Sequence, residues 1–400
     1  MKDELKKYRA EIEQELNNIL QYWAHFTPDD RNGGFFGQID NNNVVHYGAP
    51  KGSVLNSRIL WTFAAAQNNG YGMEYAGIPD RAYEYLSRHF IDEKYGGVYW
   101  TVSENGEPLE TKKQVYATAF ALYGITEHYR LRATEEIFTT MLSLYDILVD
   151  KACDKTNGGY REAFARDWTQ TADQRLSSKD ANEKKSMNTN LHVLEAFANL
   201  YTVWPNEGLR TQIADLLEIF RTKIIDQRSG HLHLFFDDEW NVRPDVISYG
   251  HEIEASWLLL DAATTIGNTH LIKAFRQVCL VLSDAATEGL DTDGGLWYEF
   301  DPQKNKLIKQ KHWWPQAEAM VGYFTAWQIG NQQKYLQRSL NSWRFTTSHI
   351  LDKQNGEWFW GANERNEPMA DEDKVGLWKC PYHNGRACLE VIKRIASFDK

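Results

Sequence analysis

Six polar side chains recur at comparable positions along this 400-residue chain, each 19 to 33 residues after a turn signal that contains glycine. They are Arg58, Tyr116, His192, His251, Glu318 and His383. Histidine titrates near neutral pH, so it can take up or release a proton without a large change of its pKa. Arginine stabilises negative charge that develops in a transition state. If the six positions meet, they favour proton transfer to and from a substrate through an anionic intermediate.

Two of these segments carry further signals. Glu254 follows His251 by three positions, on the same helical face, where a carboxylate can orient the imidazole and raise its basicity. A surface ion pair has the same spacing, so this pair alone is a weak signal. His383 lies between Pro381 and Gly385, which bracket a helix start and fit a cap as well as a catalytic position. A single histidine at a helix start is more often structural, and the prediction therefore depends on the convergence of all six residues.

Other residues have a structural explanation beside the functional one. Arg58 stands in an otherwise apolar helix, either in a buried ion pair or as a clamp on an oxyanion. Trp313 and Trp314 offer a surface on which sugar rings stack, although core packing accounts for most of the 15 tryptophans. Two adjacent tryptophans on a helix cannot both face inward. Asn188 either caps the helix that carries His192 or contributes to the site.

An internal repeat of glycine and aromatic residues positions these side chains. Its first copy reads Asn32-Gly33-Gly34-Phe35-Phe36, and its six copies are marked by Gly33, Gly96, Gly158, Gly230, Gly294 and Gly356. Glycine tolerates positive φ and aromatic residues favour strands, so each copy predicts the tight turn of a short β-hairpin. A nearly constant period of this kind indicates a repeat architecture.

The segments between the turns have apolar residues at three- and four-residue spacing, which predicts helices. The twelve predicted helices cover residues 12–23, 54–66, 81–89, 115–129, 135–148, 189–201, 209–225, 252–265, 270–282, 314–329, 334–349 and 385–395. A linear solenoid would need polar capping helices at its ends. We therefore predict an all-α fold, a closed (α/α)6 barrel of six helix pairs, with residues 1–400 as one catalytic domain. The six polar side chains then lie at or near the starts of the helices that descend from one mouth.

Composition narrows the class of protein. The net charge of −11 argues against a nucleic-acid partner, which requires clustered lysine and arginine. No apolar run reaches the length that spans a membrane, and residues 1–5 lack the apolar core of a secretion signal. The four cysteines have neither disulfide-scaffold nor zinc spacing. We expect a cytoplasmic monomer or weak dimer with no metal or other cofactor.

Residues 169–185 are predicted to be a solvated loop, with a cover over the mouth as the alternative.

Seven segments resemble, in type and order, the N-acylglucosamine 2-epimerase superfamily, and within it the cellobiose and mannose 2-epimerases. They are GGFFG at 33–37, SRILW at 57–61, Tyr116 with AFA at 119–121, NTNLHVLEA at 188–196, GHEIEASWLL at 250–259, WWPQAE at 313–318 and WKCPYHNGR at 378–386. The resemblance covers nearly the whole chain. It implies an (α/α)6 barrel that interconverts glucose and mannose at the reducing end of a sugar, without a metal, by proton transfer at C2 through a cis-enediolate.

The resemblance also implies a role for each matched residue. His251 and His383 are the acid/base pair at C2, and Glu254 tunes His251. His192 assists ring opening, and Arg58 stabilises the enediolate. The implied substrate-binding residues are Tyr116, Asn188, Trp313, Trp314, Glu318 and Trp378.

The substrate and the reaction both have alternatives. Asn56 stands where many cellobiose 2-epimerases have histidine, and Pro315 lies in the segment that would line the site of the second sugar. Free mannose or glucose therefore remains an alternative to a disaccharide. An aldose–ketose isomerase would need almost the same residues. An inverting glycoside hydrolase would need two carboxylates about 6.5–9.5 Å apart, where this chain offers histidines. A protein that only binds sugar has no use for three convergent imidazoles.

Overall fold

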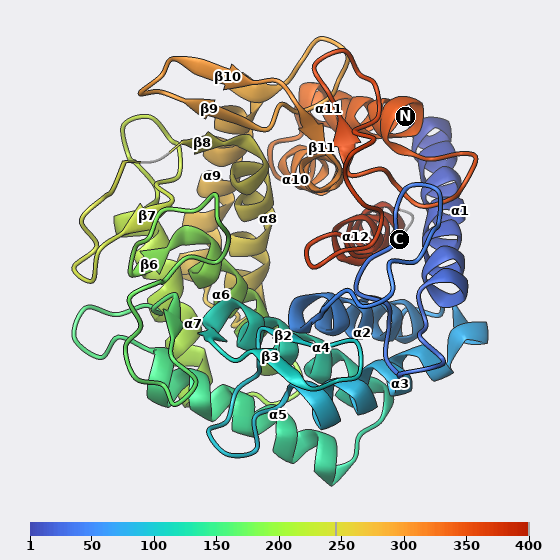
Figure 1. The fold of residues 1–400 in the computed structure, drawn as a ribbon. Coiled ribbons are helices and arrows are strands. Elements are labelled where there is room, and N and C mark those ends of the chain that lie inside the picture. Colours follow the sequence, from blue (N-terminus) through green and yellow to red (C-terminus); the bar gives the residue numbers. More distant parts are fainter. Residues whose placement is uncertain (245, 399–400) are drawn as a thin grey trace.

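The computed structural model describes residues 1–244 and 246–398, and most of these residues belong to helices (Figure 1). The α-helices are α1 Lys2–Phe26, α2 Ser53–Asn68, α3 Gly77–Tyr85, α4 Val115–Leu131, α5 Glu135–Ile147, α6 Met187–Tyr201, α7 Glu207–Ile219, α8 Tyr249–Thr265, α9 Thr269–Ala286, α10 Trp313–Gly330, α11 Gln333–Phe345 and α12 Tyr382–Ala396. All twelve predicted helices are confirmed. The largest difference is at α1, which begins ten residues earlier than predicted.

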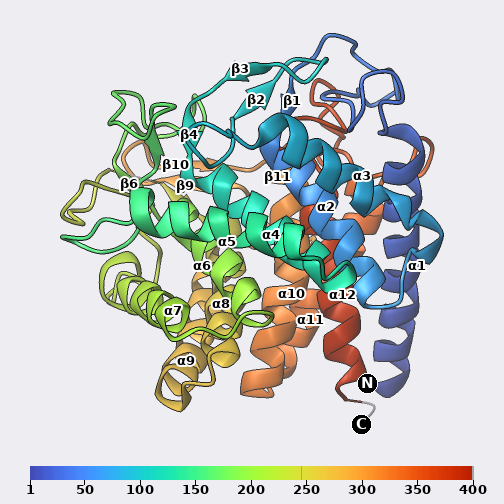
Figure 2. The ribbon, with the colours of Figure 1, turned by 90° about the horizontal axis from the view of Figure 1, so that it is seen from below.

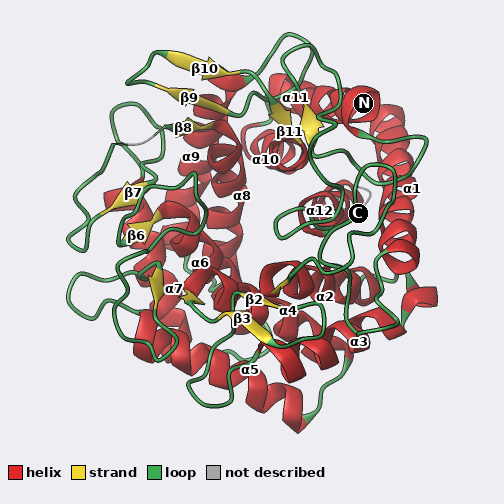
Figure 3. Cartoon of the chain, viewed as in Figure 1, coloured by secondary structure: helices red, strands yellow, loops and turns green. Residues whose placement is uncertain are grey.

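The helices form two concentric rings around one axis (Figures 1 and 3). The inner ring consists of α2, α4, α6, α8, α10 and α12, and the other six helices surround it. Inner helices are enclosed on all sides: in α2, every residue from Ser53 to Gln67 is buried. Outer helices bury one stripe, as α7 does with Leu209, Ile213 and Leu216. This arrangement confirms the predicted (α/α)6 barrel.

A tight turn closed by an antiparallel bridge precedes each inner helix, as the glycine repeat predicts. The bridges are Pro28–Phe35, Ile91–Val98, Cys153–Tyr160, Ile225–Leu232, Leu290–Leu296 and Leu351–Trp358. In the sixth turn Glu357 replaces the second glycine and adopts a φ of 61°, a region that side chains disfavour. Its carboxylate accepts hydrogen bonds from Lys379 Nζ at 2.7 Å and Trp23 Nε1 at 2.6 Å. These buried contacts offset the backbone strain.

Short strands gather at the end of the barrel where the inner helices begin (Figure 2). They are β1 Lys51–Gly52, β2 Thr101–Val102, β3 Pro108–Glu110, β4 Lys113–Gln114, β5 Ala163–Phe164, β6 Lys185–Ser186, β7 Phe235–Phe236, β8 Ile247–Ser248, β9 Glu299–Asp301, β10 Lys306–Ile308, β11 Lys311–His312 and β12 Gly361–Ala362. Each strand that runs directly into an inner helix (β1, β4, β6, β8 and β11) pairs with a strand that follows the next turn. The pairing ties neighbouring units together around the mouth.

Buried lysines reinforce this end of the barrel. Five of them pair with an aspartate of a turn at 2.6 to 2.9 Å, and we call these pairs the lysine clamps: Lys51–Asp29, Lys113–Asp92, Lys185–Asp154, Lys311–Asp291 and Lys374–Asp352. In the fourth unit, an isoleucine of β8 stands where Lys185 stands in β6. There the turn is held instead by His231 Nδ1, which lies 2.7 Å from Glu252 Oε1.

The first and last units close the ring. Trp358 Nε1 donates to Glu15 Oε1 of α1 at 2.7 Å, and Trp23 of α1 donates to Glu357 of the sixth turn. Tyr8 OH lies 3.2 Å from Ser339 Oγ of α11. Among the described residues, no helix combines the length and the apolar character that a membrane crossing requires.

Candidate active site

The structure brings the six predicted polar residues together within the first two turns of the six inner helices. Arg58 Nη2 donates to Tyr116 OH at 2.6 Å, between α2 and α4. The rings of Tyr116 and His192 of α6 meet edge to face with centroids 5.0 Å apart. His383 Nδ1 of α12 lies 2.7 Å from Glu318 Oε1 of α10. The closed barrel therefore collects at one mouth residues that are hundreds of positions apart in the chain.

His192 is held by a buried carboxylate three residues further along α6. Its Nδ1 lies 2.9 Å from Glu195 Oε2, and Tyr382 OH donates to the same carboxylate at 2.6 Å. Burial raises the pKa of Glu195, but the Arg386 guanidinium and His192 outweigh it and hold the pKa at about 2. The ionised carboxylate accepts a hydrogen bond from the protonated Nδ1 of His192. The other ring nitrogen, Nε2, therefore keeps its lone pair.

His383 is held in the same way from a different helix. Its Nδ1 contacts Glu318 at 2.7 Å and lies 3.9 Å from Glu254 Oε1 of α8. Arg386 Nη2 donates to both carboxylates at 2.7 Å, and Arg386 Nη1 donates to Glu195. We call Glu195, Glu254 and Glu318 around Arg386 the carboxylate hub. Its four members are at most 7% exposed.

His251 differs from the other two histidines. The prediction that Glu254 supports His251 is wrong, since His251 Nδ1 lies 2.9 Å from Ser248 Oγ while Glu254 pairs with Arg386. The reason is electrostatic, because a buried carboxylate gains more from a guanidinium than from a neutral imidazole. Burial lowers the pKa of His251 to about 3 and also lowers the pKa of both His192 and His383. All three rings are therefore neutral bases near pH 7.

Arg58 has no carboxylate partner among the described residues, so its predicted alternative as a buried ion pair is wrong. Its guanidinium lies 4.1 Å from the ring centroid of Phe120 and 4.7 Å from that of Tyr382. Its other contacts are Tyr116 OH and, at 3.9 Å, Cys380 Sγ. A buried positive charge with only aromatic, phenol and thiol neighbours remains available to a developing anion.

Of the three tryptophans predicted to bind sugar, one is buried by other side chains and two are half-buried. The Trp314 ring is half-buried, 4.8 Å from His251 and 5.6 Å from His383 between centroids. Trp313 is buried against Trp360 at 4.6 Å, with Lys379 Nζ 5.4 Å from its ring, so a sugar cannot stack on it as predicted. Adjacent positions on a helix point about 100° apart, which turns only one of the two toward the mouth. Trp378 is half-buried and packs on Tyr116, at 5.9 Å between ring centroids.

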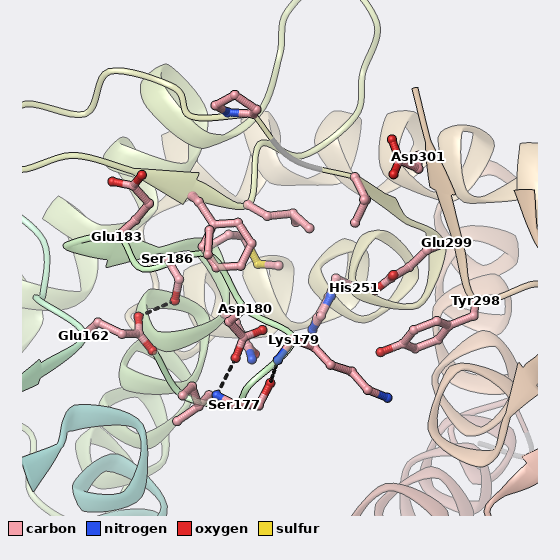
Figure 4. A pocket seen from close by; sticks show the side chains of 18 of the residues that line it. Glu162, Ser177, Lys179, Asp180, Glu183, Ser186, His251, Tyr298, Glu299 and Asp301 are labelled. Carbon is pink, nitrogen blue, oxygen red and sulfur yellow. Dashed lines mark hydrogen bonds between the residues drawn. The ribbon is translucent and has the colours of Figure 1, made fainter. Parts of the chain in front are cut away.

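A cavity of about 430 Å³ opens beside these residues (Figure 4). Asn188 and His251 are among the residues that line it. Ser186, rather than Asn188, caps α6, since its Oγ accepts from Thr189 N at 3.0 Å. The carboxamide oxygen of Asn188 is buried and lacks a protein partner among the described residues. Asn188 is thus available to a bound molecule.

The polar loop over residues 169–185 forms one wall of this cavity, through residues such as Lys179 and Asp180. Tyr298 and Glu299, at the start of the β9–β10 hairpin, line the cavity as well (Figure 4). The loop is therefore more than a solvated insertion, because it lines the cavity beside His251, as the alternative of a cover at the mouth requires. A polar stretch has the same composition in either role, so the sequence could not separate them.

Sequence reasoning missed the residues that support the histidines. Glu195 follows His192 at the same spacing as Glu254 follows His251, so this signal was present but unused. Arg386 and Tyr382 stand in the last matched segment, yet only the tertiary structure shows that both contact Glu195.

Glu254, Glu318 and His383 also have the composition of a metal site. Their ligand atoms lie within 4.8 Å of one another. Arg386 Nη2 lies 2.7 Å from both carboxylates, so a guanidinium already stands where a bound cation would contact them. The donor set therefore suits an internal cation better than a bound one.

Comparison with known proteins agrees with this architecture. The sequence profile of the N-acylglucosamine 2-epimerase family matches residues 34–387. The cellobiose 2-epimerase of Bacteroides fragilis is 43% identical over 98% of this chain and 99% of its own length, and that of Dictyoglomus turgidum is 38% identical over 98% and 100%. The solved structure of the cellobiose 2-epimerase of Bacillus thermoamylovorans superimposes with a TM-score of 0.92 at 36% identity, covering 98% of this chain and 100% of that one. The chain belongs to the N-acylglucosamine 2-epimerase family.

Proposed function

We propose that this protein is a sugar 2-epimerase that interconverts glucose and mannose at the reducing end of a cellobiose-type disaccharide. The observation that carries the proposal is the pair of imidazoles, His192 and His383, each held at Nδ1 by a buried carboxylate so that Nε2 faces away from it. This is how a protein prepares a neutral imidazole as a base. Similarity to cellobiose 2-epimerases over nearly the whole of both chains supports the substrate class.

The first step is opening of the sugar ring, because C2 becomes acidic only beside a free aldehyde. The anomeric hydroxyl must lose a proton and the ring oxygen must gain one. His192 Nε2 takes the first proton, and the imidazolium, stabilised by Glu195 at 2.9 Å, returns it to the ring oxygen. No net proton is exchanged with solvent in this step.

Epimerisation then takes place at C2 of the open chain. One of His251 and His383 removes the C2 proton, and the electron pair moves onto the carbonyl oxygen to form a cis-enediolate. Arg58, which has no carboxylate partner among the described residues, stabilises this anion. Delivery of a proton to the opposite face of C2, by the second histidine or after the intermediate has turned, produces the epimer.

The cavity beside His251 supports a disaccharide rather than a free hexose. Its volume of about 430 Å³ lies within the range of small-molecule sites. Lys179, Asp180, Tyr298 and Glu299 surround the space that a second ring would occupy next to the reacting sugar. These groups can donate and accept hydrogen bonds, as the hydroxyl groups of a sugar require.

The test is incubation with cellobiose and, separately, with mannose in D2O, followed by NMR of the products. We expect deuterium at C2 of a 4-O-glucosyl-mannose, and we expect the activity to survive exhaustive treatment with EDTA. Glucose labelled at C2 from mannose, with cellobiose unchanged, would identify a monosaccharide epimerase. Fructose as the main product would identify an aldose–ketose isomerase. Unchanged, unlabelled sugar in both tubes would refute proton transfer.

The variants His251→Ala and His383→Ala test the assigned residues. Each should abolish turnover while thermal stability changes little, because neither ring is needed to close the barrel. The control is His270→Ala, an exposed histidine on the outer helix α9. A histidine variant that keeps the activity of the parent would remove that residue from the mechanism.

A further inference from the structure

We infer that Arg386 is a positioning residue that sets the orientation and the tautomer of both His192 and His383 through the carboxylate hub. The inference rests on the proposed function, since it concerns the two imidazoles that serve as bases there. Arg386 donates to the glutamates and the glutamates hold the imidazoles, so its action is indirect.

One guanidinium joins four inner helices at this point. Arg386 of α12 donates from Nη2 to Glu254 of α8 and Glu318 of α10, and from Nη1 to Glu195 of α6 and to Tyr382 OH. Glu195 and Glu318 in turn hold the two imidazoles. A planar guanidinium has donors in a fixed fork, whereas an ammonium is a point charge, so arginine determines the direction of each carboxylate and lysine does not.

The positive charge matters as much as the geometry. Three carboxylates in a buried site without a cation would take up protons. A protonated carboxyl donates a hydrogen bond to Nδ1 instead of accepting one, so the imidazole would carry its proton on Nε2 and could no longer act as a base there. Burial raises the pKa of Glu254 and Glu318 even with Arg386 present, while Glu195 stays ionised. Removing Arg386 would raise the pKa values of all three glutamates.

A second cavity reaches Arg386 from the opposite end of the barrel. It has a volume of about 140 Å³ and lies among the C-terminal halves of the inner helices, with Thr202, Thr265 and Glu390 on its walls. Arg386 and Glu195 form its inner end, and Arg386 Nε is buried without a hydrogen-bond partner among the described residues. Truncating the Arg386 side chain would open the hub to this cavity, so a small cation could reach the glutamates without passing the sugar.

The first experiment compares Arg386→Ala and Arg386→Lys with the parent in the epimerase assay. We expect kcat to fall by about 10²-fold in both variants, the effect of misplaced catalytic groups, while KM changes by only a few-fold. For Arg386→Ala, activity should also rise with pH over the range where the parent is constant, because the hub carboxylates ionise later. The matched control is Arg394→Lys, two turns further along α12, which pairs with Asp261 and Glu390.

The second experiment is chemical rescue. Guanidinium chloride, well below denaturing concentration, should restore part of the kcat of Arg386→Ala, should act without competing with the sugar, and should leave the parent unchanged. Urea has a similar size and no charge, so it should not rescue. Rescue by guanidinium that urea does not match supports the inference; equal effects of the two, or no rescue of a folded variant, overturn it.

Two further results test the role of Arg386 if Arg386→Ala does not fold or if the protein catalyses a reaction other than epimerisation. A folded Arg386→Lys that keeps the kcat and the pH profile of the parent overturns the inference. Imidazole 15N NMR needs no substrate: the parent should show Nδ1-protonated His192 and His383, and Arg386→Lys should show a mixture of tautomers. An unchanged imidazole spectrum overturns the inference, whereas failure of the parent to epimerise any sugar refutes only the proposed function.

Discussion

At the scale of single residues, the histidines of the mouth combine burial with neutrality. Burial lowers the pKa of His251 to about 3 from an ordinary value of 6.5. A histidine whose pKa is lower in the folded chain binds fewer protons there than in the unfolded chain, so it reduces stability as the pH falls below 6.5 and costs nothing well above it. The site thus gives up stability in acid for bases that remain unprotonated at neutral pH.

This lowering predicts the pH dependence of the reaction. We expect kcat/KM to show no acid limb at the ordinary histidine value of 6.5, because burial lowers the pKa of His192, His251 and His383 and keeps these rings neutral near pH 7. The measurement is the pH–rate profile, with circular dichroism at each pH to confirm that the protein stays folded. An acid limb with an apparent pKa of 6.5 or higher in folded protein would show that the reacting histidine is more solvated than the structure describes.

At the scale of the elements, four of the five lysine clamps connect a glycine turn to a strand that leads into an inner helix. In the third unit, Lys185 Nζ lies 2.7 Å from Asp154 Oδ2, with Lys185 wholly buried. Burial raises the pKa of Asp154, but the hydrogen bond from Lys185 and those from the turn outweigh it and lower the pKa to about 2. Because β6 leads directly into α6, this clamp fixes the start of α6 and so the positions of Asn188 and His192 on it.

Breaking one clamp should therefore be costly. We expect Lys185→Met to lower the free energy of unfolding by roughly 3–5 kcal/mol, since it leaves Asp154 buried without its partner. The double variant Lys185→Met/Asp154→Asn should recover a large part of that loss, because it removes both charges. Urea titrations measure both, and Ile247→Met, at the equivalent strand position of the fourth unit, is the control. A single variant as stable as the control would contradict the argument.

At the scale of the whole molecule, the barrel is closed by contacts between its two ends. Trp23 of α1 is fully buried and donates to Glu357, and Glu15 of the same helix accepts from Trp358. These side chains join the first helix to a turn more than 300 residues later. We propose on this basis that residues 1–400 unfold as one domain.

Trp23→Ala tests this closure. We expect a loss of roughly 3–5 kcal/mol in the free energy of unfolding, the usual cost of removing a large buried aromatic side chain. If the ring is cooperative, a fluorescent probe on the distant helix α7 should report the same lowered midpoint as far-ultraviolet circular dichroism. Phe26→Ala is the control, because Phe26 ends the same helix and is 46% exposed. Two separate transitions would contradict a single domain.

The sequence by itself determined the architecture and which candidate residues gather at the mouth. Every unit repeats the same turn and the same helix pair, so the period predicts a closed barrel, and residues at similar distances from the turns must gather at one mouth. Arg58, His192, His251 and His383 could be found in this way because each lies within the first two turns of an inner helix. Such local and periodic signals do not depend on which neighbour a side chain finally meets.

Only the tertiary structure decided the partners. Glu254 has the spacing to support His251 but pairs with Arg386, because a guanidinium from α12 reaches it inside the barrel. Glu195 has the same spacing and does hold His192. The loop over residues 169–185 lines the cavity beside His251, and β6 at the end of the loop is paired with β7 of the next unit. Hydrogen bonds, burial and charge balance depend on distances between helices, and those distances exist only once the ring has closed.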